Sequence, residues 1–130
     1  MATRSAIGYK AVDGTIRAVY CHWDGYLGNN GLILNQMYTD QSKIWQMVEL
    51  GDISSLKGEI ADTVYYGRDK GETDVATQSY NDVDEYVTHY ADGCEYMYLW
   101  NNKYKEWVVT QGDGKWMRLE DALELEAIAF

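Results

Sequence analysis

The sequence contains no proline, one phenylalanine, two cysteines and two histidines among its 130 residues. Without proline, turns and helix ends depend on glycine, asparagine and aspartate. No apolar run reaches about 18 residues, which argues against a membrane-spanning helix. The first residues lack the apolar core of a secretory signal, so we expect a cytosolic protein. In a reducing cytosol, Cys21 and Cys94 are expected to stay free rather than to pair.

Basic residues are also scarce, with 11 Lys and Arg against 21 Asp and Glu, for a formal net charge of −10. Nucleic-acid binders need a basic footprint, so direct binding to DNA or RNA is disfavoured. No zinc-ligand spacing and no phosphate-binding glycine motif occurs, so we expect neither a metal nor a cofactor. An acidic surface keeps a protein soluble, and it also suits a basic partner.

Apolar residues make up 46% of the chain, which is typical of a folded globular protein. The length predicts one domain over residues 1–130, large enough to bury a core without disulfides. Twelve tyrosines and five tryptophans are many for this length. Such residues are common at interfaces and in stacking pockets, and they are equally ordinary in the cores of sheet proteins.

Residues 4–26 predict a β-hairpin that runs into a polar and aromatic loop. Asp13 and Gly14 suggest a two-residue type I′ turn. That turn pairs Ile7 with Tyr20 and sets Lys10 opposite Arg17, a mildly unfavourable like-charge pair. Because side chains alternate between the faces of a strand, one hairpin face is expected to enter the core. This face comprises Ile7, Tyr9, Ala11, Ile16, Ala18 and Tyr20.

The rest of the chain predicts alternating short helices and strands. A helix is expected at 31–38, capped by Asn30, and a second one starts at Asp40 and ends at Gly51. A third is expected at 81–91, capped by Ser79 or Asn81, and a fourth from 119 to the end. Strands are expected at 60–66, 94–100, 104–110 and 115–118, with an exposed loop at 67–78. The order ββ-α-α-β-α-βββ-α predicts an α+β fold, in which N- and C-terminal hairpins build an antiparallel sheet covered by about four helices.

The run from Cys21 to Asp24 is the densest group of reactive side chains. A thiol beside an imidazole suggests a nucleophile, but consecutive strand residues point to opposite faces, so Cys21 and His22 are not expected to interact. His22 and Asp24 share a side. Asp24 then either orients the imidazole or satisfies backbone groups at the strand end.

A candidate ligand site follows from the same loop. An arginine, several aromatic rings and a flexible glycine loop suit a pocket for a planar or anionic small molecule. The residues expected to converge there are Arg4, Tyr20, His22, Trp23, Asp24 and Tyr26. We assign no catalytic residues, and binding is the better expectation than catalysis.

Several runs carry a resemblance to a known group of sequences. They are RSAIG at 4–8, DG at 13–14, YCHWDGY at 20–26, GLIL at 31–34, GDISSL at 51–56, YMYLW at 96–100 and WVV at 107–109. The chain resembles a family of small uncharacterised proteins from bacteriophages and from bacterial genomes that carry phage genes. The resemblance implies a phage accessory protein working in the host cytoplasm, and it brings no established activity or catalytic residue.

Two functions remain open at this point. The first is a non-catalytic protein that binds and inhibits or modulates a host factor, such as a defence protein with a basic nucleic-acid-binding surface, through an acidic, aromatic-rich surface. The alternative is a protein that binds or degrades a small ligand, such as a nucleotide signal, in a pocket around the CHWDGY loop at residues 21–26. A purely structural role is a third reading. We also expect a homo-oligomer, formed through edge strands.

Overall fold

Eight strands, four α-helices and one π-helix alternate along residues 2–128, the part of the chain that this computed structural model describes. The elements are β1 (Ser5–Lys10), β2 (Ile16–Cys21), η1 (Leu27–Gly31), α1 (Leu32–Met37), α2 (Gln41–Glu49), β3 (Ile53–Ser55), β4 (Val64–Tyr65), β5 (Gln78–Tyr80), α3 (Val83–Tyr90), β6 (Tyr96–Asn101), β7 (Glu106–Thr110), β8 (Met117–Arg118) and α4 (Leu119–Ile128). The predicted α+β class and its four short helices are confirmed.

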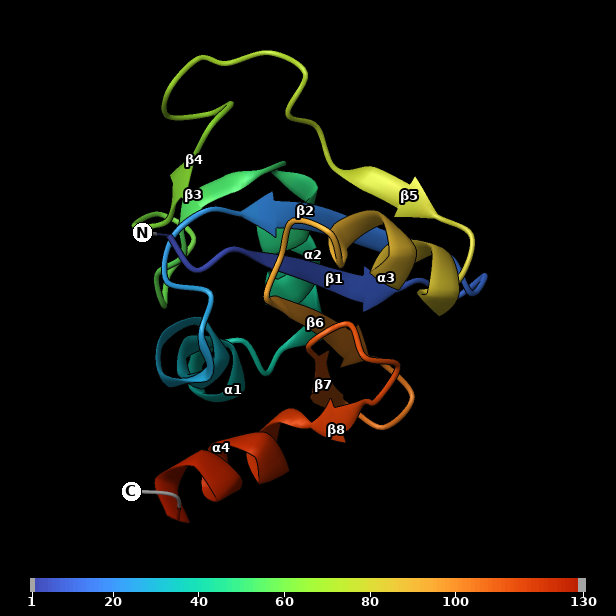
Figure 1. Cartoon of the computed structure of the whole chain (residues 1–130). Coiled ribbons are helices and arrows are strands. Elements are labelled where there is room, and N and C mark those ends of the chain that lie inside the picture. Colours follow the sequence, from blue (N-terminus) through green and yellow to red (C-terminus); the bar gives the residue numbers. More distant parts are fainter. Residues whose placement is uncertain (1, 129–130) are drawn as a thin grey trace.

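The strands form one sheet in the order β4-β3-β2-β1-β6-β7-β8, with β5 paired to β2 (Figure 1). The N-terminal hairpin β1–β2 and the C-terminal hairpin β6–β7 are antiparallel, as the sequence predicts. The hairpins join through a parallel β1–β6 pair, and β3 also lies parallel to β2. The sheet is therefore mixed rather than wholly antiparallel.

The register of the first hairpin differs from the prediction by one residue. Ile7 pairs with Val19, and Lys10 pairs with Ile16. The cause is the turn, since the Ala11 N–H donates to Thr15 O at 2.7 Å and Gly14 has φ +92°. This is a three-residue loop with a left-handed glycine, not a two-residue type I′ turn.

This register changes the hairpin faces and removes the predicted like-charge pair. Ile7, Tyr9, Val19 and Cys21 share one core cluster, whereas Ile16 and Ala18 belong to another. Arg17 lies opposite Tyr9 rather than Lys10, and its guanidinium forms a bidentate pair with Glu49 of α2.

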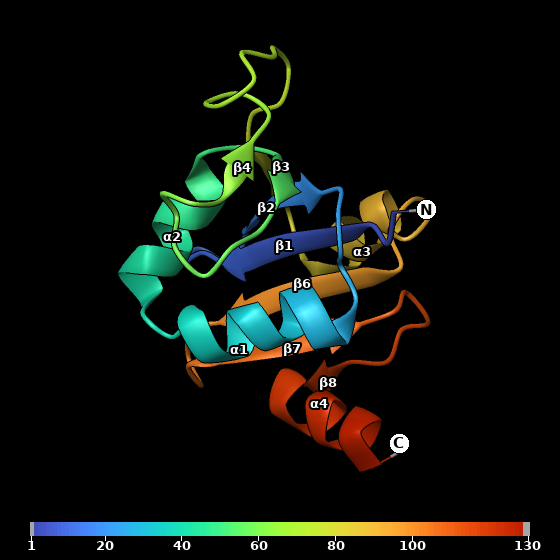
Figure 2. The ribbon, with the colours of Figure 1, turned by 90° about the vertical axis from the view of Figure 1, so that its left-hand side faces the viewer.

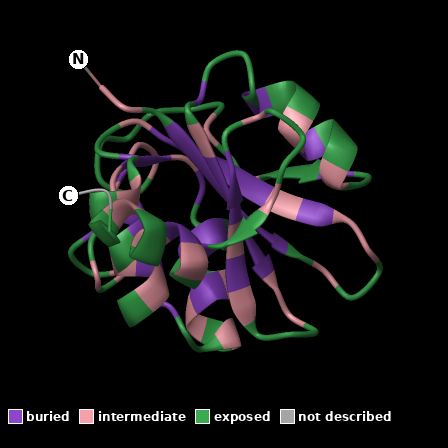
Figure 3. Ribbon diagram, turned by 60° about the horizontal axis from the view of Figure 1, so that its bottom comes forward, coloured by how far each residue is buried: buried purple, intermediate pink, exposed green. Residues whose placement is uncertain are grey.

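Both faces of the sheet are buried, so hydrophobic alternation could not correct the register that the predicted turn implied. Residues of α1, α2 and α4 pack in the cluster on one face, and Tyr86 and Tyr90 of α3 pack on the other. Figure 2 shows α1 in front of β6 and β7, α2 to the left of the strands and α3 behind them. Buried residues follow the central strands, and exposed residues lie on the outer sides of the helices (Figure 3). A one-residue slip therefore exchanges one apolar face for another, so the apolar pattern discriminates poorly between registers.

The ends of the helices follow local chemistry in part. The Asp40 carboxylate accepts from Lys43 N–H at the start of α2, and Gly51 follows that helix with φ +95°, as predicted. For α3 the cap is Asp82 instead, which accepts from Glu85 N–H. Asn30 caps nothing, because η1 already surrounds it.

The connections contain more strand than the sequence suggests. The predicted strand at 60–66 reduces to the two residues of β4. Residues 52–58, for which no strand is predicted, contribute β3, and β5 begins at the end of the predicted loop. These short strands form only through long-range pairing, since β5 lies on Ile16–Ala18 and β3 reaches Cys21. Three strands therefore separate α2 from α3, instead of one.

Candidate functional site

A cavity of about 570 Å³ opens on the α3 face of the sheet, next to the ends of β2 and β5. Figure 1 shows α3 and β5 beside β2 at this end of the molecule. The walls of this cavity combine one cation, two carboxylates, one histidine and three tyrosines. They are Arg4, Tyr20, Asp52, Asp74, Ala76, Gln78, Tyr80, His89, Tyr90, Gly93 and Cys94. The volume lies within the range of about 300–1,000 Å³ that is typical of small-molecule sites.

Sheet pairing places the cation of this cavity. Arg4 directly precedes β1, and its carbonyl accepts from Glu95 N–H at 2.9 Å, just before β6 begins. Cys94 N–H in turn donates to Tyr90 O, the last residue of α3, at 2.9 Å. The Arg4 side chain is exposed, and among residues 2–128 no carboxylate forms an ion pair with it.

Asp52 supplies the inner carboxylate. One of its oxygens accepts from Tyr20 N–H at 3.0 Å, where β3 approaches β2. Its own N–H donates to Val75 O at 2.8 Å, which holds the 67–77 segment against the cavity. Burial raises the pKa of this carboxyl, and the Tyr20 N–H offsets part of that rise. Within residues 2–128, no basic side chain forms an ion pair with Asp52.

Tyr20 connects the cavity to the predicted loop. Its hydroxyl lies 2.7 Å from Nδ1 of His22. The His22 ring meets Trp23 edge to face, with 4.6 Å between ring centroids. Burial raises the pKa of the Tyr20 phenol, and the nearby Arg4 guanidinium partly counteracts it. At neutral pH the phenol is therefore protonated and available as a hydrogen-bond donor.

The six predicted ligand residues divide into two groups. Arg4 and Tyr20 line the cavity, and His22 reaches it through Tyr20. Trp23 lies beyond His22 and is 45% exposed. Asp24 and Tyr26 do not line the cavity, and both are exposed. Of the two alternatives for Asp24, orientation of His22 is not seen, since the partner of His22 Nδ1 is the Tyr20 hydroxyl. Asp24 itself has a left-handed backbone with φ +56°.

Much of the 20–26 run, instead, holds the fold. Gly25 packs so closely on the N-terminal segment that a Cβ there would lie 2.6 Å from Ser5 Cβ. Gly25 N–H donates to Thr3 O, and the buried Tyr98 hydroxyl donates to Gly25 O at 2.7 Å. The fully buried Asn30 amide donates to Ser5 Oγ and to Cys21 Sγ. These contacts fix where β2 ends and η1 begins.

The two cysteines are free and buried. Burial raises the pKa of the Cys21 thiol to about 11 and that of Cys94 to about 12. Both thiols are therefore protonated near neutral pH, whereas the nucleophilic form of cysteine is the thiolate. This agrees with the sequence argument against a thiol nucleophile at Cys21. Cys94 contributes to the cavity as a small apolar wall.

Sequence reasoning missed most of the cavity wall. Asp52, Asp74, Tyr80 and His89 come from four segments that only the fold brings together. One signal was available, because His89 is one of only two histidines and lies at the end of a predicted helix. Nothing in the sequence marks Asp52 among 21 acidic residues.

Two searches of residues 2–128 for other kinds of site were negative. No group of three or more His, Cys, Asp or Glu side chains lies close enough together to hold a metal ion in this part of the chain. None of its helices is long and apolar enough to cross a membrane.

Comparisons with models of known protein families, with curated proteins and with solved structures gave no match. The site therefore has to be interpreted from its own residues.

Proposed function

We propose that this protein binds a small, planar anion of low charge in the Arg4 cavity, and that the ligand is a nucleotide. The observation that carries the proposal is Arg4 itself, a guanidinium at a ligand-sized cavity without a carboxylate partner in the described chain. A guanidinium presents paired donors that match phosphate or carboxylate geometry.

The remaining walls suit the other parts of a nucleotide. Asp52 has accepting capacity beyond its bond to Tyr20 N–H, which suits a sugar hydroxyl or an amino group. Tyr20, Tyr80 and His89 supply ring faces or edges for a planar base. Each feature alone is common, and their meeting in one cavity favours this ligand class.

Charge limits which nucleotides fit. The cavity carries one arginine against Asp52 and Asp74, and the whole chain has a net charge of −10. A polyphosphate meets repulsion both inside the cavity and on approach. We therefore expect cyclic nucleotides and monophosphates to bind more tightly than triphosphates.

The biological setting belongs to the same proposal. The resemblance to phage proteins suggests a phage accessory protein in the host cytoplasm, where sequestering a nucleotide signal would blunt a host response. A protein of this kind needs no catalytic set, because binding alone removes the signal. If the protein also degrades the bound nucleotide, turnover of that nucleotide will be measurable.

A thermal-shift screen tests the proposal. A ligand that binds only the native state raises the melting temperature, by an amount that grows with its concentration. The panel should contain cyclic mononucleotides, cyclic dinucleotides, nucleoside mono- and triphosphates, NAD and ADP-ribose. We expect at least one singly charged or cyclic member to stabilise the protein. A melting temperature that no nucleotide moves, with inorganic phosphate and free nucleosides equally inert, would contradict the proposal.

A second candidate is a protein that binds a basic host factor, such as the nucleic-acid groove of a defence protein. A specific observation favours it, namely that residues 82–95 carry five acidic residues and no lysine or arginine. Four of the 11 basic residues are also held in ion pairs within the described chain, namely Arg17, Lys43, Arg68 and Arg118. Capture from host lysate tests this candidate. A partner retained at low salt and released at high salt supports it, and no retention at low salt excludes it.

A further inference from the structure

We propose that the protein assembles head to tail, with the C-terminal half of α4 of one copy docked between the two hairpin tips of the next. The proposal is independent of the nucleotide site. It concerns two surfaces, which we call the tip surface and the tail surface. The tip surface is made of Lys10, Val12, Lys103, Tyr104 and Lys105, and the tail surface of Glu124, Leu125 and Ile128.

The tip surface is formed by the parallel pairing of β1 and β6. This pairing sets Tyr9 beside Trp100, so the two hairpin turns end next to each other. A cavity of about 440 Å³ lies between them, lined by both turns. Val12 is 93% exposed and Tyr104 is 64% exposed at its edge. Exposed apolar side chains around a hollow are typical of a docking site.

The tail surface is also exposed and apolar. Leu125 and Ile128 are spaced one helical turn apart on α4, with Glu124 beside them. Leu125 is 55% exposed and Ile128 is 80% exposed. Together with Val12 and Tyr104, they are the four most exposed large hydrophobic residues of the described chain. These two exposed apolar side chains can therefore pack into the hollow of another copy.

Charge identifies the partner as a second copy. In a chain of net charge −10, three lysines gather at the tip surface, against one acidic residue, Asp13. The Asp13 carboxylate is bound by the N–H and the hydroxyl of Thr15. The tail surface carries Glu124 and no basic residue.

The geometry requires two different surfaces to meet. In Figure 2 the β1 and β6 arrows point to one side of the molecule, and the C-terminal end of α4 lies on the opposite side. One copy therefore has both surfaces free at the same time. Such a contact is heterologous, so it builds closed rings or open filaments rather than a two-fold dimer. The edges β4 and β8, which are two residues long, offer little for the strand pairing that the sequence suggested.

Light scattering on a matched set of variants tests this arrangement. The tip variant is Lys103→Glu with Tyr104→Ser, and the tail variant is Leu125→Gln with Ile128→Gln, which keeps good helix formers in α4. Lys57→Glu is the charge control, because Lys57 is exposed and belongs to neither surface. Circular dichroism on each variant establishes that the fold is intact.

We expect the wild type and Lys57→Glu to exceed the monomer mass of 14.9 kDa, increasingly so with concentration and less so at high salt. Each double variant alone should remain at 14.9 kDa. Their equimolar mixture should form a particle of twice that mass, because one intact tip surface then meets one intact tail surface. A wild type that stays monomeric, folded variants that assemble like the wild type, or a mixture that stays monomeric would each overturn the proposal.

Discussion

The hydroxyl of Tyr20 lies 2.7 Å from Nδ1 of His22, and this contact joins the cavity to the aromatic loop. The roles of the two atoms depend on the His22 tautomer, and we predict that the phenol donates to Nδ1, which leaves the ring proton on Nε2. Nitrogen chemical shifts above neutral pH should therefore report the Nε2–H tautomer for His22. In Tyr20→Phe the tautomer preference should weaken while the fold persists. A dominant Nδ1–H form in the wild type would contradict this hydrogen bond.

Substitution of Asp24 should hardly change the stability of the protein, although the sequence suggests that Asp24 either orients His22 or satisfies backbone groups. Its carboxylate is exposed and has no hydrogen-bond partner within residues 2–128. Asparagine tolerates the left-handed backbone at this position as well as aspartate does. We expect Asp24→Asn to change stability by less than about 0.5 kcal/mol, as is usual for surface substitutions. Calorimetric unfolding measures this, and a loss of about 2 kcal/mol would show that Asp24 is a structural partner after all.

Gly25 should be intolerant of any side chain. A Cβ there would lie 2.6 Å from Ser5 Cβ and 2.9 Å from Thr3 O, so the N-terminal segment would have to move. Gly25→Ala should cost about 1–3 kcal/mol, the usual range for overpacking. Gly93→Ala is the matched control, since a Cβ at Gly93 meets nothing within 4 Å. Equal melting temperatures for the two variants would refute the close packing.

Asp52 should reduce stability in the absence of ligand. Burial raises the folded-state pKa of this carboxyl, so the native protein favours the protonated form. Native stability therefore falls as the pH rises from the unfolded-state pKa, about 3.9, through the folded-state pKa. Asp52→Asn removes this loss and still provides an oxygen for Tyr20 N–H. We expect a higher melting temperature than the wild type at pH 7 and no such gain below pH ~3.5. A variant that is less stable than the wild type at pH 7 would contradict the raised pKa.

The sequence predicts those parts of the fold that local chemistry determines. The cap at Asp40, the left-handed Gly51 and the second hairpin need only neighbouring residues, and each agrees with the structure. The register of the first hairpin was predicted wrongly because Asp13–Gly14 is compatible with both a two-residue and a three-residue turn. With apolar residues on both faces of β1, the hydrophobic pattern gave no means of choosing between them.

The candidate site was predicted only in part, because it depends on long-range pairing. Arg4, Tyr20 and His22 are near one another through the hairpin, which is visible in the sequence. Asp52 reaches Tyr20 only when β3 lies along β2, and Asp74 follows through the Val75 carbonyl. These contacts join residues more than 20 positions apart, and no periodic pattern in the sequence indicates them.

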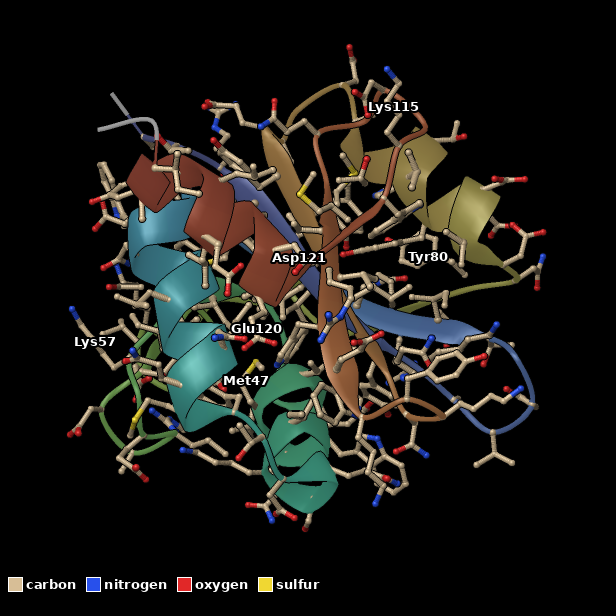
Figure 4. All side chains as sticks on the ribbon, turned by 90° about the horizontal axis from the view of Figure 1, so that it is seen from below. Met47, Lys57, Tyr80, Lys115, Glu120 and Asp121 are labelled. Carbon is tan, nitrogen blue, oxygen red and sulfur yellow. The ribbon has the colours of Figure 1, made fainter. Side chains whose placement is uncertain are left out.

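The central claim is that Arg4 binds the anionic group of a ligand. Its most direct test is titration calorimetry of the best nucleotide from the screen against the wild type, Arg4→Ala and Lys57→Ala. Lys57→Ala removes the same unit of charge, and Figure 4 shows Lys57 on the opposite side of the molecule from Tyr80 of the cavity. Loss of a charged hydrogen bond costs about 1.5–3 kcal/mol, so Arg4→Ala should weaken binding roughly 10- to 150-fold. Lys57→Ala should bind like the wild type. Equal dissociation constants for Arg4→Ala and the wild type would contradict the account.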